Sequence, residues 1–174
     1  MPLTTRGIIL TGGWNRRDFL RCSTLAALGW VTGCATNPVT GKSQIMLMSE
    51  KDEIAVDRQH APKQISADYG VTQDRQLEDY IARTGKRLVP ATHRPQMPYR
   101  FMVVNATYVN AYAFPGGSIA ATRGILLKLD NEAELAALLG HELGHVNARH
   151  TAQQMSKATL TQALVGGAAA MAGT

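Results

Sequence analysis

Cysteine is scarce in this chain of 174 residues, and both cysteines, Cys22 and Cys34, lie near the N-terminus. The main part of the chain therefore has no structural disulfide and no cysteine-ligated zinc site. Long apolar runs and internal repeats are missing as well, and no segment has the about 20 apolar residues that a transmembrane helix needs. The length suits one domain with a substantial core rather than two large domains.

Charge is unevenly distributed along the chain. The formal net charge of +5 includes +3 from residues 1–33, where four arginines face one aspartate. From Cys34 onward, 14 Lys and Arg residues face 12 Asp and Glu residues, so most of the chain is nearly neutral. Nucleic-acid binding relies on clustered positive charge. We therefore expect no nucleic-acid partner.

The basic N-terminus predicts an export signal over residues 1–33. Asn15–Arg21 resembles the twin-arginine export signal, and a short, weakly apolar run follows it. Val31–Cys34 resembles a lipoprotein signal-peptidase box, in which Cys34 receives lipid and becomes the first mature residue. An ordinary secretory peptide, or an over-long start with chance arginines, is the alternative. Ala35 after a lipidated cysteine favours the outer membrane of a Gram-negative host, so we expect a lipid anchor on the periplasmic side of the envelope.

The rest of the sequence predicts an α+β domain over residues 49–174, preceded by a turn-rich tether over residues 34–48. A capping serine with acidic residues in the first turn predicts a helix over residues 49–61, which Pro62 should end or kink. Apolar residues at helical spacing predict a second helix over residues 73–89, with a proline as its stop. Both helices should cover a small sheet.

Strand composition replaces helical spacing in the middle of the chain. β-Branched and aromatic residues predict three strands over residues 99–105, 108–114 and 118–122, in a mixed or antiparallel sheet. Pro115-Gly116-Gly117 is the expected turn between the last two strands. The small residues from Gly166 to Thr174 predict a flexible tail.

The most informative motif is His141-Glu142-Leu143-Gly144-His145, on a long helix that should run from a cap at Asp130 or Asn131 through Lys157. Two histidines four residues apart on a helix differ by about 40° around its axis and about 6 Å along it. Both imidazoles can therefore bind one zinc ion and leave a position open for water. Glu142 lies at the edge of that face, where its carboxylate can take a proton from the zinc-activated water.

Further segments accompany this motif in a fixed order: Asn110–Gly117, Arg123–Leu126, Asn131–Gly140 and Arg149-His150. Together they resemble the zinc metallopeptidases of the HtpX and BepA type, relatives of the CAAX prenyl proteases, and the resemblance covers residues 37–155. It implies a zincin-like fold and a zinc-dependent endopeptidase of the bacterial cell envelope. His141 and His145 would be ligands of one Zn²⁺ per chain, and Glu142 would be the general base.

The resemblance also implies where a substrate binds. The strand formed by Asn110, Ala111, Tyr112 and Ala113 would line the cleft and offer its edge to an extended peptide. Simple core packing is the alternative for this strand. The substrates would be unfolded or misassembled envelope proteins, since several members of the family serve quality control there.

The third zinc ligand is missing from the sequence. In the enzymes that the chain resembles, a glutamate on a later helix completes the site, yet no Asp or Glu follows Glu142. Ala148 and Thr151 stand where a metzincin has glycine and histidine. His150 would lie about 140° from His145 on a continuous helix, so we expect it to be solvated or to neighbour a ligand.

Other candidates for this ligand also fail. Glu134 would lie about 10 Å from His141 along the helix axis. His60 on the first helix and His93 in a proline-bracketed loop lack ligand spacing. The simplest interpretation is truncation, with the sequence resembling the N-terminal portion of a longer enzyme.

Two other functions compete with the peptidase. A non-catalytic envelope lipoprotein would keep the fold and bind partners without cutting them, and the missing ligand favours it. A purely structural motif helix is the other alternative. It is disfavoured because a glutamate between two histidines is costly to bury unpaired.

Overall fold

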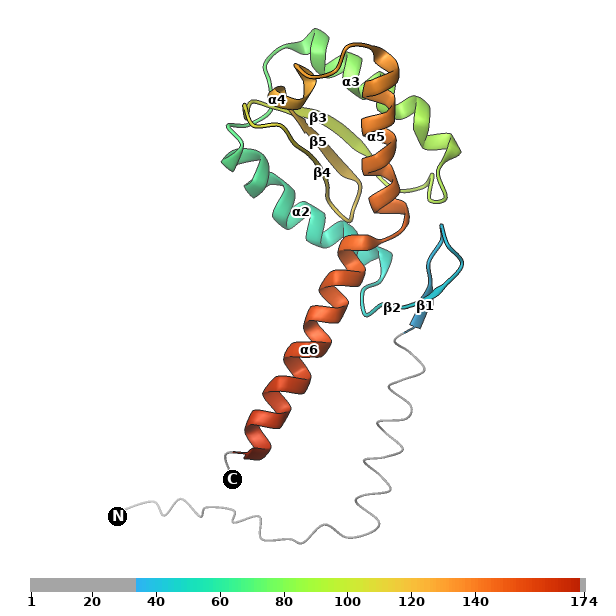
Figure 1. Cartoon of the computed structure of the whole chain (residues 1–174), viewed down its shortest axis with the longest axis vertical. Coiled ribbons are helices and arrows are strands. Elements are labelled where there is room, and N and C mark those ends of the chain that lie inside the picture. The colour runs from blue at the N-terminus through green and yellow to red at the C-terminus, as the bar shows by residue number, and fades with distance from the viewer. Residues whose placement is uncertain (1–33, 173–174) are drawn as a thin grey trace, which may run out of the picture. The chain divides into compact units, whose positions relative to one another are not determined.

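The computed structural model describes residues 34–172, so the export signal predicted over residues 1–33 lies outside the described residues. The described residues form an α+β unit, as predicted, with helices on both faces of a small sheet (Figure 1). The described elements are, in chain order, β1 (Cys34–Thr36), β2 (Ser43–Ile45), α2 (Glu50–Ala67), α3 (Arg75–Leu88), the 3-10 helix η1 (Val89–Ala91), β3 (Arg100–Val104), β4 (Ala111–Ala113), β5 (Ser118–Thr122), α4 (Arg123–Leu126), α5 (Glu132–Asn147) and α6 (His150–Ala172).

The central sheet is mixed and has the strand order β3-β5-β4. β3 runs parallel to β5, whereas β4 is antiparallel to β5 and lies at the edge. A tight turn joins β4 to β5. A hydrogen bond of 2.8 Å from Phe114 N–H to the Ser118 carbonyl closes it. Gly117 adopts a φ of +104° in this turn, a conformation that favours glycine. The predicted mixed sheet and its Pro-Gly-Gly turn are confirmed.

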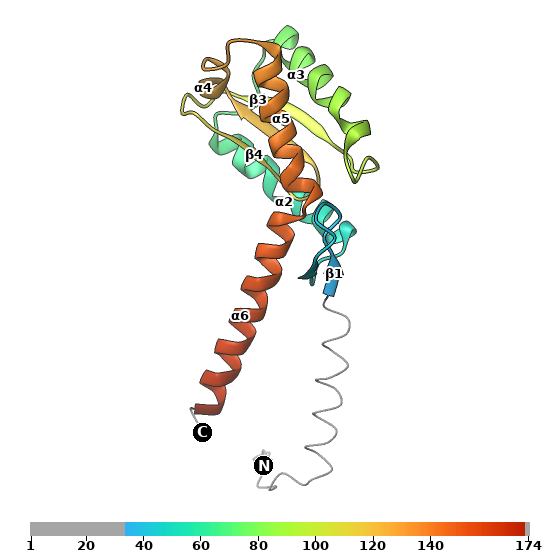
Figure 2. The ribbon, with the colours of Figure 1, turned by 45° about the vertical axis from the view of Figure 1, so that its right-hand side comes forward.

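Alternating side chains of the strands build a core on each face of the sheet. On one face, Phe101, Val103 and Ile119 pack against α3 and α5. On the opposite face, Met102, Val104 and Ala120 form a smaller cluster that Ile65 of α2 and Tyr112 cover. Figure 2 shows α5 and α3 side by side over the sheet. The buried apolar residues of α3 and α5 that complete the first cluster are Ile81, Leu135, Leu139 and Leu143.

Helix α2 begins as predicted but does not end where predicted. Ser49 and Asp52 form a reciprocal capping box, with Ser49 N–H donating to the Asp52 carboxylate at 2.8 Å. The helix continues past Pro62 to Ala67, so the predicted end near Ala61 was wrong, and of the two predicted effects of Pro62, an end or a kink, the first does not occur. Pro62 and Arg58, the residue four positions earlier, both lie on the exposed face, where water can satisfy the carbonyl that proline leaves unpaired.

Helix α3 follows the prediction closely. Asp74 caps it, accepting a hydrogen bond from Leu77 N–H at 3.1 Å. The helix ends at Leu88, and Pro90 lies in the 3-10 turn that follows. The predicted stop at this proline is therefore confirmed.

The motif helix is shorter than the sequence predicts. α5 ends at Asn147, and Arg149 adopts a φ of +58° before α6 begins at His150. The prediction of one helix through Lys157 was therefore wrong. Arg149 N–H still bonds to the Val146 carbonyl at 3.1 Å, which closes α5 with a turn in place of further helix.

Helix α6 also replaces the flexible tail predicted from Gly166 onward, since it continues to Ala172. Four of its last six residues are alanine, the residue with the highest helix propensity. None of the described helices is long and apolar enough to cross a membrane.

The segment predicted as a tether contains the antiparallel hairpin of β1 and β2. Asn37, in the turn of the hairpin, is buried and donates to the Ala148 carbonyl at 3.1 Å. Leu47 N–H donates to Ser156 Oγ at 2.9 Å. The hairpin and the residues after it thus pack against the α5–α6 junction and the first turns of α6.

Candidate active site

Helix α5 presents the motif from a firmly anchored position. Asn131 caps its start, with the Asn131 side chain accepting from Glu134 N–H at 3.1 Å. Leu135, Leu139 and Leu143 are buried against the sheet, so the two histidines of the motif lie toward the other side of the helix. The sequence of α5 therefore both packs the helix and orients the motif.

His141 and His145 lie as two ligands of one metal ion would lie. His141 is exposed and His145 half-buried, and their rings meet edge to face with centroids 4.8 Å apart. The two Nε2 atoms are 3.2 Å apart. Tetrahedral zinc with nitrogen ligands at about 2.0–2.1 Å separates two such atoms by about 3.3–3.4 Å. The separation of the two Nε2 atoms is therefore close to the one that a shared zinc ion would impose.

Glu142 lies between these histidines in sequence but is buried. Burial raises the pKa of its carboxyl, and the two neighbouring histidines His145 and His141 partly counter this effect. A raised pKa brings a carboxylate closer to the range in which it both accepts and returns a proton near neutral pH. Glu142 thus has the environment of a general base.

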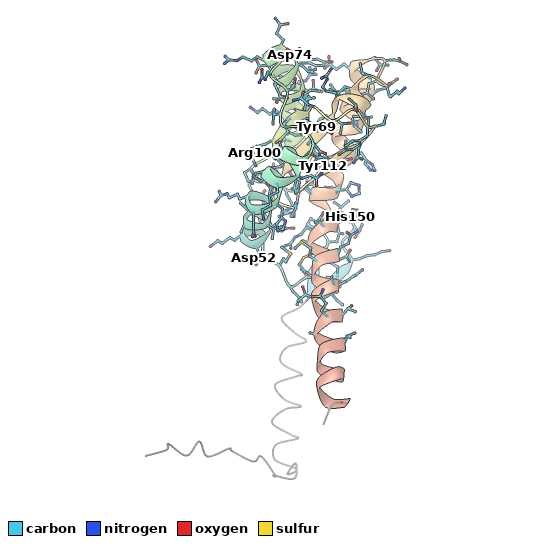
Figure 3. The ribbon with its side chains drawn as sticks, turned by 90° about the vertical axis from the view of Figure 1, so that its left-hand side faces the viewer. Asp52, Tyr69, Asp74, Arg100, Tyr112 and His150 are labelled. Carbon is cyan, nitrogen blue, oxygen red and sulfur yellow. The ribbon has the colours of Figure 1, made fainter. Side chains whose placement is uncertain are left out.

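His150 contacts the other side of the His145 ring. The Nδ1 atoms of His145 and His150 are 2.8 Å apart, and Figure 3 shows His150 at the end of α6 that joins α5. The pKa of His150 lies below its usual range because of burial and the nearby His145. The sequence predicts that His150 is solvated or neighbours a ligand, and in the structure it is exposed and contacts His145. The prediction assumed a continuous helix, whereas Arg149 adopts the left-handed conformation just before His150.

No third ligand joins the two histidines in the described part of the chain, where no group of three His, Cys, Asp or Glu side chains could hold a metal ion. Glu134 is engaged at the start of α5, where its carboxylate accepts from Asp130 N–H at 2.9 Å. His60 and His93 are exposed on α2 and on the loop after η1.

β4, with Asn110 before it, is the strand for which the family resemblance implies substrate binding, with core packing as the alternative. The Asn110 carbonyl accepts from Thr122 N–H at 3.0 Å, so Asn110 and Phe114 both bond toward β5. In an antiparallel pair this orientation alternates, and the backbone groups of Ala111 and Ala113 therefore point to the outer edge. No further strand pairs with this edge among residues 34–172.

The side chains of this strand are held from both faces of the sheet. Ala113 packs against the cluster that contains α5. Tyr112 points to the opposite face, where its hydroxyl donates to the Asp68 carboxylate at 2.5 Å. Tyr108 donates to the same carboxylate at 2.8 Å. Asp68 at the end of α2 thus fixes both ends of the segment from Tyr108 to Tyr112.

Cys34 is the first residue that the structure describes. It begins β1, where it pairs with Ile45. Its lipidation stays a prediction.

Comparison with known proteins identifies a family and several relatives of this chain. Residues 75–174 match peptidase family M48. The chain is 34% identical over 120 residues to the Beta-barrel assembly-enhancing protease of Yersinia pestis, a match that covers 69% of this chain and 24% of that protein. It is 33% identical over 93 residues to the protein of the same name from Escherichia coli K12, covering 53% and 19%. It is 32% identical over 87 residues to the Mitochondrial metalloendopeptidase OMA1 of Arabidopsis thaliana, covering 50% and 18%. The chain spans about a quarter or less of these curated relatives.

Proposed function

Because this chain belongs to peptidase family M48, we propose that it supplies the zinc-binding helix and the substrate edge of a metalloendopeptidase of the bacterial cell envelope. One observation carries the proposal: the Nε2 atoms of His141 and His145 are 3.2 Å apart, close to the separation of about 3.3–3.4 Å that one tetrahedral zinc ion requires. The adjacent buried Glu142 supplies the base that peptide hydrolysis needs.

The chemistry divides between the metal and the side chains of the chain. Zinc, when bound, lowers the pKa of a water toward about 7 and polarises the scissile carbonyl. His141 and His145 hold the metal through Nε2. The Glu142 carboxylate takes a proton from the water that adds to the carbonyl carbon and passes it to the amine as the C–N bond breaks. A catalytic zinc normally has three protein ligands, so we expect this chain, which brings two together, to bind zinc more weakly than a complete site.

The outer edge of β4 would bind the substrate as an added strand. Ala111 and Ala113 each direct an N–H and a C=O away from the sheet, and Asn110 precedes them. α5 packs against β4, so a peptide on this edge would run beside the helix that bears the motif. The backbone would supply affinity, and the scissile bond would lie toward His141 and His145.

The proposed location is the periplasmic side of the envelope, with a lipid anchor at Cys34 in the outer membrane. The lipoprotein box at Val31–Cys34 supports it, as does the similarity to proteins named for β-barrel assembly. Unfolded or misassembled envelope proteins would be the substrates. A Cys34→Ser variant should leave the membrane fraction, and one that stays there would contradict the anchor.

The test of the enzyme is a comparison of this chain with its Glu142→Gln variant. Both are loaded with zinc at micromolar supply, and zinc content and casein cleavage are measured. We expect equal zinc in both chains and cleavage in the parent only, because glutamine keeps the shape of the side chain but accepts no proton. Cleavage that survives Glu142→Gln would overturn the proposed base. A chain that takes up no zinc would instead support the non-catalytic lipoprotein.

A further inference from the structure

His150 approaches the nitrogen of His145 that does not face His141. The His145 Nε2 atom lies 3.2 Å from His141 Nε2, whereas the His145 Nδ1 atom lies 2.8 Å from His150 Nδ1. The His145 and His150 rings meet at an interplanar angle of 70° with centroids 5.0 Å apart. His145 is thus held between two imidazoles, one at each of its nitrogens.

The junction between α5 and α6 brings His150 to this position. Arg149 precedes it in the left-handed conformation, and its Nη2 donates to the Met48 carbonyl at 2.7 Å. Arg149 Nε donates to Glu53 at 3.1 Å, and the Glu53 side chain is fully buried. The break between α5 and α6 therefore rests on contacts with the start of α2. A continuous helix would have pointed His150 about 140° away from His145.

A metal ion on Nε2 of His145 would determine where the protons of this pair lie. A separation of 2.8 Å between two nitrogens requires one to donate and the other to accept. If His145 Nε2 is to ligate a metal it must carry a lone pair, so the proton of neutral His145 lies on Nδ1. His150 Nδ1 is then the acceptor, and the proton of neutral His150 lies on Nε2.

We propose that His150 is a positioning residue, which accepts the hydrogen bond from His145 Nδ1 and thereby fixes the tautomer and the ring orientation that offer Nε2 to zinc. This inference rests on the proposed function. Metal-binding histidines generally donate their second N–H to such a partner, and loss of the partner costs about 10–100-fold in metal affinity. An imidazole performs here the role that a carboxylate or carbonyl more often performs.

The test uses the full chain and four variants. His150→Ala removes the acceptor, and His150→Gln offers an amide oxygen in its place. His93→Ala removes an exposed histidine elsewhere and is the matched control. His145→Ala identifies the His145 signals by their loss. Zinc affinity is measured by competition with a chromophoric chelator, and ¹⁵N NMR of the imidazoles reports the tautomer of His145 in the metal-free chain. Circular dichroism checks that each variant is folded.

We expect His150→Ala to lower zinc affinity by about 10–100-fold, with His145 shifting from the Nδ1-protonated form to a mixture of tautomers. His150→Gln should recover part of both losses, and His93→Ala should change neither. Unchanged affinity and unchanged tautomer in folded His150→Ala would overturn the inference while leaving the proposed function intact. If the parent chain binds no zinc, the proposed function and the inference fail together. The tautomer measurement then shows whether the hydrogen bond itself exists.

Discussion

Glu53 on α2 accepts a hydrogen bond from Arg149 at the α5–α6 junction, with 3.1 Å between Arg149 Nε and Glu53 Oε1, although 96 positions separate the two residues. The other oxygen of Glu53 accepts from Arg94 Nη2 at 2.6 Å. Arg94 Nη1 in turn donates to the carbonyl of Val146, in the last turn of α5, at 3.0 Å. One buried carboxylate thus holds two arginines that both contact the end of the motif helix.

Glu53→Gln should destabilise the protein strongly. The substitution leaves two largely buried guanidinium groups without their shared carboxylate, and breaking a buried pair by removing one partner costs about 3–5 kcal/mol. Urea unfolding measures the loss. Glu50→Gln is the matched control, since Glu50 contacts the same Arg94 at 3.1 Å but is 44% exposed. Glu50→Gln should lower the free energy of unfolding by only about 0–1 kcal/mol. If both variants lost the same unfolding free energy, the buried carboxylate of Glu53 would contribute no more to stability than the exposed one of Glu50.

The carboxylate of Asp68 should make stability depend on pH in the acid range. Burial acts to raise the pKa of Asp68, but hydrogen bonds from Tyr112, Gln64 and Tyr108 outweigh it and lower the pKa below its usual value. A carboxyl whose pKa is lower in the folded state stabilises the fold above its unfolded pKa of about 3.9. This contribution is lost as the pH falls through the folded pKa.

Asp68→Asn should therefore be less stable than the parent at pH 6, and the difference should shrink as the pH falls below about 4. Unfolding free energies between pH 2 and pH 6 measure it. Asp79→Asn, on the exposed face of α3, is the control and should change the unfolding free energy little at pH 2 or at pH 6. A difference between parent and Asp68→Asn that is constant with pH would contradict the role of the charge.

Zinc should stabilise the fold through His141 and His145. A ligand that binds only the folded state at 100 times its Kd adds about 2.7 kcal/mol. Thermal unfolding with zinc, and again with a chelator, measures the shift in Tm. His141→Ala and His145→Ala should abolish the shift, whereas His93→Ala should retain it. A shift that persists in both variants would place the metal elsewhere.

Local signals in the sequence predicted most of the fold. The helix start at Ser49 and Asp52, the helix stop before Pro90 and the Pro-Gly-Gly turn each depend on a few neighbouring residues, and each lies in the structure where predicted. The paired histidines of the motif follow from helix geometry alone, provided that they lie in one helix, and α5 contains both.

Long-range contacts account for what the sequence did not predict. Nothing near Arg149 indicates a left-handed residue, because the carboxylate that holds its side chain comes from Glu53 on α2. The contact of His150 with His145 depends on that break, so the sequence predicts a histidine that is solvated or neighbours a ligand but not the turn that brings it there. The effect of Pro62 on the length of the helix was overestimated. Its exposed position makes the lost hydrogen bond tolerable.

The outer edge of β4 can be tested with a proline that the sheet itself should tolerate. Ala113 directs its N–H away from β5, so Ala113→Pro removes no hydrogen bond of the sheet, and proline is accepted at such edge positions. The residue before it, Tyr112, is already extended, as proline requires. If substrate pairs with this edge, the variant should keep its unfolding free energy but lose one donor to the peptide.

We therefore expect Ala113→Pro to raise KM for peptide cleavage by about 10-fold, the equivalent of one net hydrogen bond of about 1–1.5 kcal/mol, with kcat changed less. A peptide substrate methylated at the backbone nitrogen that pairs with this edge should show a similar loss with the parent chain. An unchanged KM in a folded Ala113→Pro would mean that β4 serves core packing alone and that the substrate binds at another surface.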